Sequence, residues 1–98
     1  MIELDKATAD DFSPALDQDF ELITGTGTIS LRLVAVDKKG LSHPARPEPF
    51  TLRFEGAPPL RIPQAIYRLQ NVTVGTIDLF LVQLGADAKG SQFEAVFN

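Results

Sequence analysis

The sequence predicts an all-β protein: a small six-stranded antiparallel β-barrel with a short N-terminal helix, with a β-sandwich as the alternative. From residue 19 onwards, apolar and polar residues alternate at a period of two, which is typical of strands with one buried face. Short glycine-containing segments separate several of these stretches, as β-hairpins require. Because six antiparallel strands leave unpaired edges unless they close on themselves, we favour the barrel.

Length and composition indicate one ordinary globular domain, residues 1–98. A folded chain of this length has an expected radius of gyration of about 13 Å. Apolar residues make up 44% and charged residues 22% of the chain, so we do not expect global disorder. The chain has no cysteine, which removes disulfides, thiolate catalysis and cysteine-ligated metal centres.

The N-terminal region carries the helix signal. Thr8 can cap the free N–H groups of a first turn, and the aspartates two and three residues later suit the positive end of the helix dipole. Phe12 and Leu16 lie four residues apart and give the helix one apolar edge. Since Pro14 falls too late for the first helical position, we expect about two interrupted turns. This helix is expected to cover one open end of the barrel.

Six segments show the strand alternation. In the last of them Phe93, Ala95 and Phe97 alternate with Gln92, Glu94 and Val96, so this strand is expected to belong to the core. Two longer connections, residues 37–49 and 56–65, hold three prolines each and should be stiff. The predicted strands are residues 19–22, 29–36, 50–55, 66–70, 77–82 and 92–97, and the predicted hairpin turns are residues 25–27, 71–75 and 85–90.

Charge is distributed unevenly along a chain whose net charge is −4. Residues 1–24 hold seven acidic residues and one basic one, whereas residues 25–70 hold seven basic residues and three acidic ones. Either the acidic segment packs on a basic sheet within one molecule, or the two regions meet between copies or in a complex. We expect no nucleic-acid partner, because the chain is acidic overall and lacks a dense Lys/Arg stripe.

The N-terminus lacks the pattern of a secretory signal, and no apolar run approaches the ~20 residues that span a bilayer. We therefore expect a cytoplasmic protein with no membrane partner.

Four segments form a distinctive set: Ala9–Phe12, Pro63–Leu69, Gly75–Val82 and Phe93–Asn98. With them the chain resembles, over nearly its whole length, a bacterial family of similar size described as a domain of unknown function. Members of that family are often encoded beside phage-tail-collar-like proteins, so the resemblance implies an accessory role near a tail-like assembly. The family has no established catalytic or binding residues, and the resemblance therefore assigns a role to no residue.

Candidate catalytic and metal-binding residues are few. His43 is the sole histidine, and the hydroxyl of its neighbour Ser42 is poorly placed for a nucleophile–base pair. Asp17, Asp19 and Glu21 are expected on one face of the first strand, where they form a line rather than the convergent set that a hard cation needs. The sequence therefore predicts no enzyme, no cofactor and no metal site.

Two features indicate an interface. The segment around Phe80 and Val82 is apolar on both strand faces, so a surface patch remains unless the helix covers it. Lys38, Lys39 and Arg46 in the first proline-rich connection provide a positive field for acidic surfaces, including residues 10–21 of a second copy.

The leading hypothesis from the sequence is thus a non-catalytic protein-interaction or assembly module, with a protein partner or self-association. The alternative is a small-ligand-binding β-barrel. The many Phe, Leu and Ile residues of the inward faces weigh against it, because they should fill so small a barrel.

Overall fold

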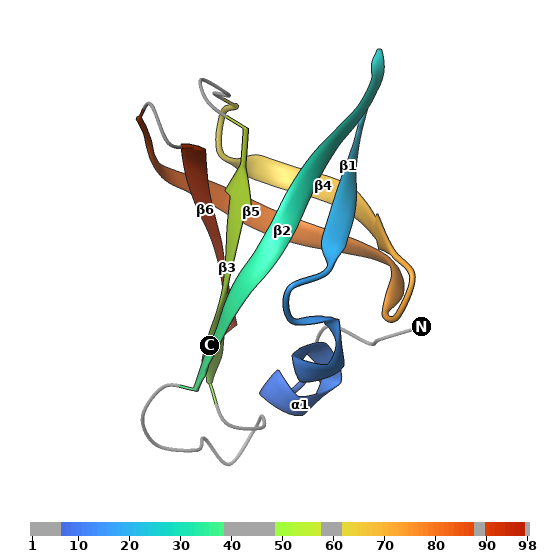
Figure 1. Ribbon diagram of the computed structural model, residues 1–98, viewed down its shortest axis with the longest axis vertical. Helices are drawn as coiled ribbons and strands as arrows, with labels where there is room; N and C mark the ends of the chain where they lie inside the picture. Colours follow the sequence, from blue (N-terminus) through green and yellow to red (C-terminus); the bar gives the residue numbers. More distant parts are fainter. Residues whose placement is uncertain (1–6, 39–48, 58–61, 88–89, 98) are drawn as a thin grey trace.

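A computed structural model shows a closed antiparallel barrel of six strands with a helical segment at one end (Figure 1). The structure describes residues 7–38, 49–57, 62–87 and 90–97. Around the barrel the strands follow the order β1-β2-β3-β6-β5-β4, and β4 pairs back with β1. The predicted barrel is confirmed, and the sandwich alternative is not. The Cα radius of gyration, 13.1 Å, also agrees with the expected value.

The strands agree with the predicted ones in number and order but are longer in several places. In particular, β5 and β6 pair up to Asp87 and Gly90, so the predicted six-residue turn at 85–90 is wrong. A register shift between Gln83 and Gly85 lets this pairing continue. The elements are α1 (Ala9–Phe12), the 3₁₀-helix η2 (Ser13–Ala15), β1 (Asp19–Thr24), β2 (Gly27–Lys38), β3 (Phe50–Gly56), β4 (Ala65–Asn71), β5 (Gly75–Asp87) and β6 (Gly90–Phe97).

The helical segment is short and interrupted, as predicted. The Asp11 carboxylate accepts a hydrogen bond from the Thr8 backbone N–H at 2.9 Å, and η2 begins just before Pro14. The predicted apolar edge is wrong at Leu16, which is 43% exposed. Leu16 follows the last helical residue with an extended ψ of 136°, so it leaves the helical surface. Ala9 and Ala15 are buried instead, together with Phe12. No described helix has the length and apolar character of a membrane-spanning one.

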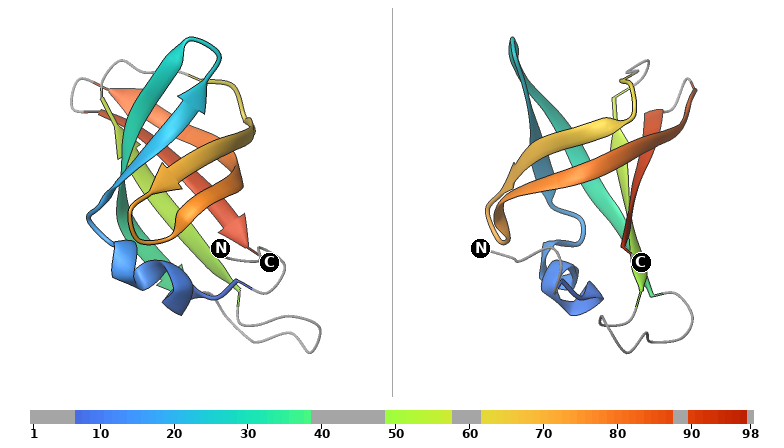
Figure 2. Two further views of the ribbon diagram at one scale, coloured as in Figure 1. Left: turned by 90° about the vertical axis from the view of Figure 1, so that its right-hand side faces the viewer. Right: turned by 180° about the vertical axis from the view of Figure 1, so that it is seen from behind.

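Three aromatic rings close the end of the barrel that α1 covers. The ring of Phe12 lies 5.8 Å from that of Phe50 and 5.7 Å from that of Phe97, between centroids. Phe50 and Phe97 are directly opposite each other on β3 and β6, and their rings stack at 4.4 Å. Figure 2 shows α1 under this end of the barrel. The helix therefore acts as a plug, as the sequence predicted.

The barrel interior is filled with side chains. Phe20 and Phe54 meet edge to face at 5.2 Å in the middle of the core. In a barrel of only six strands, the inward-facing side chains are packed densely enough to fill the interior. The largest fully buried side chains are Phe12, Phe20, Phe50, Phe54, Phe93, Leu22, Leu31, Leu33, Leu52, Leu69, Leu81 and Ser91.

Removal of residues 93–98 is expected to abolish folding. β6 lies between β3 and β5, and Phe93 is completely buried. Loss of a buried phenylalanine costs about 3–5 kcal/mol, which is comparable to the whole stability of a small domain. Thermal unfolding followed by near-ultraviolet circular dichroism should show no cooperative transition for the truncated chain. A transition unchanged from that of the full chain would contradict the central place of β6.

Candidate interaction surface

An apolar row lies on the outer face of β4, β5 and β6. Its most exposed members are Ile66, Phe80 and Val96, which are 72%, 49% and 51% exposed. Ile66 and Phe80 are directly opposite each other on β4 and β5. Val82, two residues along β5 from Phe80, is half-buried and lies opposite Glu94 of β6. The sequence indicated Phe80 and Val82, and it gave no sign that Ile66 and Val96 share their face.

The helix does not cover this row. Phe12 packs over the end of the barrel, against Phe50 and Phe97, while Phe80 keeps half of its surface exposed. We call Ile66, Phe80, Val82 and Val96 the outer apolar row. On the surface of a globular domain, adjacent large apolar side chains of this kind are typical of a contact surface.

Charged residues of both signs flank the outer apolar row. The Arg68 Nε donates to Asp78 Oδ1 at 3.0 Å, one row along β4 and β5 from Ile66 and Phe80. This hydrogen bond, with the coulombic attraction of Asp78, raises the pKa of the Arg68 guanidinium. On the other flank, Arg53 of β3 lies opposite Glu94. The surface around the row therefore carries alternating charges and no net charge.

The acidic N-terminal segment has basic neighbours within the same molecule. Lys38 Nζ lies 3.8 Å from Asp10 Oδ1, and Arg32 Nε lies 3.9 Å from Asp19 Oδ1. These contacts support the interpretation in which the acidic segment packs on the basic sheet of its own chain. Both pairs are exposed, and such pairs contribute little stability. The other two basic residues of the predicted interface, Lys39 and Arg46, lie outside the described residues, as does His43.

The expected line of three carboxylates is wrong at Asp17. This residue precedes β1 and has a φ of 68°, in the left-handed region. Its backbone N–H donates to the carbonyl of Leu33 at 2.7 Å, and the N–H of Leu33 donates to the carbonyl of Gln18 at 3.1 Å. Within the described ranges, no three His, Cys, Asp or Glu side chains lie close enough together to hold a metal ion.

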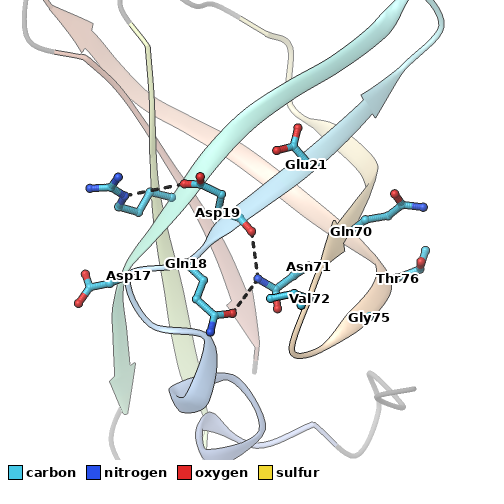
Figure 3. A pocket seen from close by; sticks show the side chains of 10 residues that line it. Asp17, Gln18, Asp19, Glu21, Gln70, Asn71, Val72, Gly75 and Thr76 are labelled. Atoms are coloured by element: carbon cyan, nitrogen blue, oxygen red, sulfur yellow. Dashed lines mark hydrogen bonds and ion pairs between the residues drawn. The ribbon is translucent and has the colours of Figure 1, made fainter.

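An open groove of about 710 Å³ crosses the outer surface where β1 meets β4 (Figure 3). Most of the residues that line it are polar, and several of their side chains already have partners inside the molecule. Asp19 faces Arg32, and the side-chain amides of Gln18 and Asn71 bind each other at 3.1 Å. The groove is lined by Asp17, Gln18, Asp19, Glu21, Arg32, Gln70, Asn71, Val72, Gly75 and Thr76.

Asn71 fastens the β4–β5 turn to the start of β1. Its Oδ1 accepts the backbone N–H groups of Thr73 and Val74 at 2.8 and 2.9 Å, which shapes the turn. Its Nδ2 donates to the carbonyl of Asp19 at 3.0 Å and to the Gln18 side chain. The turn ends at Gly75, whose φ of 82° favours glycine. We call this set of hydrogen bonds the Asn71 clamp.

Only part of β4 is covered by β1. The two strands share three residue pairs, Glu21–Gln70, Leu22–Leu69 and Ile23–Arg68. Beyond Arg68, the first three residues of β4, Ala65–Tyr67, pair with β5 but with no other described strand. Figures 1 and 2 show the β1–β2 hairpin leaving β4 at this point and rising past the barrel. The barrel thus has a short free edge beside the outer apolar row.

These features define a small helix-plugged β-barrel that presents an apolar row, a free strand edge and an open groove lined mostly by polar residues. The family model of a domain of unknown function, DUF6916, matches residues 7–97, and the chain belongs to this family. Neither the curated proteins nor the solved structures contain a match to the chain. The resemblance seen in the sequence is confirmed as membership of an uncharacterised domain family.

We expect the substitution Asn71→Ala to lower the free energy of unfolding by about 1–3 kcal/mol, because buried groups that bind Asn71 lose their partner. Urea unfolding provides the measurement. Gln70→Ala is the matched control: Gln70 is the preceding residue and is exposed, so its removal should change stability by less than ~0.5 kcal/mol. Equal effects of the two substitutions would contradict the clamp.

Proposed function

We propose that this protein is a non-catalytic protein-interaction or assembly module whose contact surface is the outer face of β4, β5 and β6. The observation that carries the proposal is the outer apolar row. Ile66 and Phe80 sit side by side on neighbouring strands and stay largely exposed, although the same chain buries a complete core elsewhere. A strand that is apolar on both of its faces is ordinarily covered on both faces.

The energetics of the surface suit a protein partner. Complete burial of one large apolar side chain stabilises by about 1.5–3 kcal/mol, and two such residues lie next to each other here. The flanking charges Arg68, Asp78, Arg53 and Glu94 cancel, so the surface does not select a strongly charged partner. Contact through such a surface depends mainly on shape and apolar area.

The alternative of a small-ligand-binding barrel has less support. Its site would be the barrel interior, and that interior is occupied by large side chains with no exposure. An accessory role in a phage-tail-like assembly is the specific setting that the family resemblance adds to the interaction hypothesis. A closed barrel loses little conformational freedom when it binds another protein, and this suits an assembly role.

The double substitution Phe80→Ser and Val96→Ser should weaken association at least ten-fold while the protein stays folded. Both residues are half exposed, so each contributes about half of the 1.5–3 kcal/mol of a fully buried side chain, and the buried core is left intact. Val72→Ser is the matched control, because Val72 is 91% exposed in the β4–β5 turn, outside the row. Sedimentation velocity over a range of protein concentrations measures self-association, and co-purification from a native extract measures partner binding.

We expect the wild-type protein and the Val72→Ser variant to self-associate, or to bind the same partner, with equal affinity. The affinity of the double variant should be at least ten-fold lower. If the double variant retains the same mass and the same partner as the wild type, the outer apolar row is not the contact surface. A cooperative thermal transition in all three proteins is the check on folding.

A further inference from the structure

We propose that the free edge of β4 pairs with the same edge of a second copy, in antiparallel orientation about a two-fold axis at Ile66. We call the backbone of Ala65–Tyr67, on the side away from β5, the β4 edge. The inference deepens the proposed function and rests on it, since it names the partner and the way in which the partner binds.

The first argument is the unpaired backbone. β1 covers β4 at Arg68, Leu69 and Gln70, and among the described residues no strand continues that cover over Ala65–Tyr67. On the opposite side, the backbone groups that point towards β5 have a strand partner, since Ala65, Ile66 and Tyr67 each have a register partner there. A row of free N–H and C=O groups at a strand edge is complementary to the backbone of another strand.

The second argument is that the β4 edge lacks the features that keep strand edges apart. Natural edges are blocked by lysine, proline or a bulge. Ala65–Tyr67 contains no charge and no proline, and the pairing of β4 with β5 shows no register shift. Other strands also have stretches with a strand partner on one side only, among them Gly75–Leu81 of β5, which pairs with β4 but not with β6 and carries the charge of Asp78. Ala65–Tyr67 is a one-sided stretch without a charge, and it includes the exposed side chain of Ile66.

The side chains of the β4 edge match their own copies. In a register centred on the axis, Ile66 lies opposite Ile66 of the second copy, and Ala65 lies opposite its Tyr67. No charge enters these pairs, and Arg68 stays paired with Ile23 of its own β1. On the outer face, Phe80 and Ile66 of each copy then form one continuous apolar band across both barrels, which aromatic and aliphatic cross-strand neighbours stabilise.

The expected contact is small. The contact consists of three residue pairs and one apolar side chain from each copy. The surface that it buries is smaller than the ~1,200 Å² that stable complexes need. The dimer should therefore be weak and dependent on concentration. Covalent trapping is the suitable measurement, and the absence of any native cysteine makes a single introduced cysteine an unambiguous probe.

The test compares three single-cysteine proteins, Ile66→Cys, Phe80→Cys and Val72→Cys, under mild oxidation at equal concentration. Residues directly opposite across antiparallel strands have Cα atoms about 4.5–5.5 Å apart, which a disulfide can bridge. In the proposed dimer the two copies of residue 80 are three strand spacings apart, about 14 Å, which a disulfide cannot bridge. Val72 is 91% exposed, and its cysteine variant reports random collision.

We expect the Ile66→Cys protein to form disulfide-linked dimers at least ten-fold faster than the Val72→Cys protein, with the Phe80→Cys protein near the rate of Val72→Cys. Faster dimerisation of Phe80→Cys than of Ile66→Cys would show face-to-face packing through the outer apolar row, which overturns edge pairing and leaves the proposed function in place. Equal rates for all three proteins, in a chain that sediments as a monomer, would overturn the β4 edge as a contact. Because all three positions are exposed, matching circular dichroism spectra are expected and confirm that each variant is folded.

Discussion

Closure of the barrel between β1 and β4 is the constraint on which the rest of the structure depends. This seam consists of three residue pairs, whereas β4 and β5 share seven. Without the seam the six strands would form an open, strongly bent sheet with two free edges. Leu22 and Leu69, which lie opposite each other across it and are completely buried, would then face water. The Asn71 clamp holds the β4–β5 turn on the start of β1, directly beside the seam. A short seam is therefore supported by side-chain hydrogen bonds at one end only.

The other end of the seam explains the surface. Beyond Arg68 the β1–β2 hairpin departs from β4, so the backbone of Ala65–Tyr67 has β5 as its sole described strand neighbour. The residue at the centre of this stretch, Ile66, is also the most exposed member of the outer apolar row. The incomplete seam and the exposed row are two results of the same geometry. Both leave groups without a strand partner or cover at one position of the barrel: the polar backbone of Ala65–Tyr67 and the apolar side chain of Ile66.

The helical plug covers the end of the barrel and not its side wall. Phe12 completes a group of three rings with Phe50 and Phe97 at the end of the barrel, and this leaves the side wall uncovered. A helix of four residues followed by a 3₁₀ turn is too short to reach both. The chain thus uses its single described helical segment for the core, and the outer faces of β4, β5 and β6 remain available to a partner.

The period of two was sufficient to predict the six strands, their buried faces and the barrel, because alternation is a local consequence of the pleat. Local patterns failed where the backbone leaves regular structure: Leu16 follows the last helical residue, and Asp17 takes a left-handed φ. The candidate surface was predicted at Phe80 and Val82 but not at Ile66, since only the strand register brings Ile66 beside Phe80. The Asn71 clamp could not be predicted from the sequence either, because Asn71 and Asp19 are 52 residues apart in it.

Hydrogen exchange of the β4 backbone amides, measured residue by residue at low and at high protein concentration, tests the incomplete seam most directly. At low concentration we expect the amides of Leu69 and its neighbours in the seam to be protected. Those amides of Ala65–Tyr67 that point away from β5 should exchange rapidly, and they should become protected as the concentration rises. Protection of all β4 amides at every concentration would contradict a free edge, and rapid exchange throughout the seam would contradict the closed barrel.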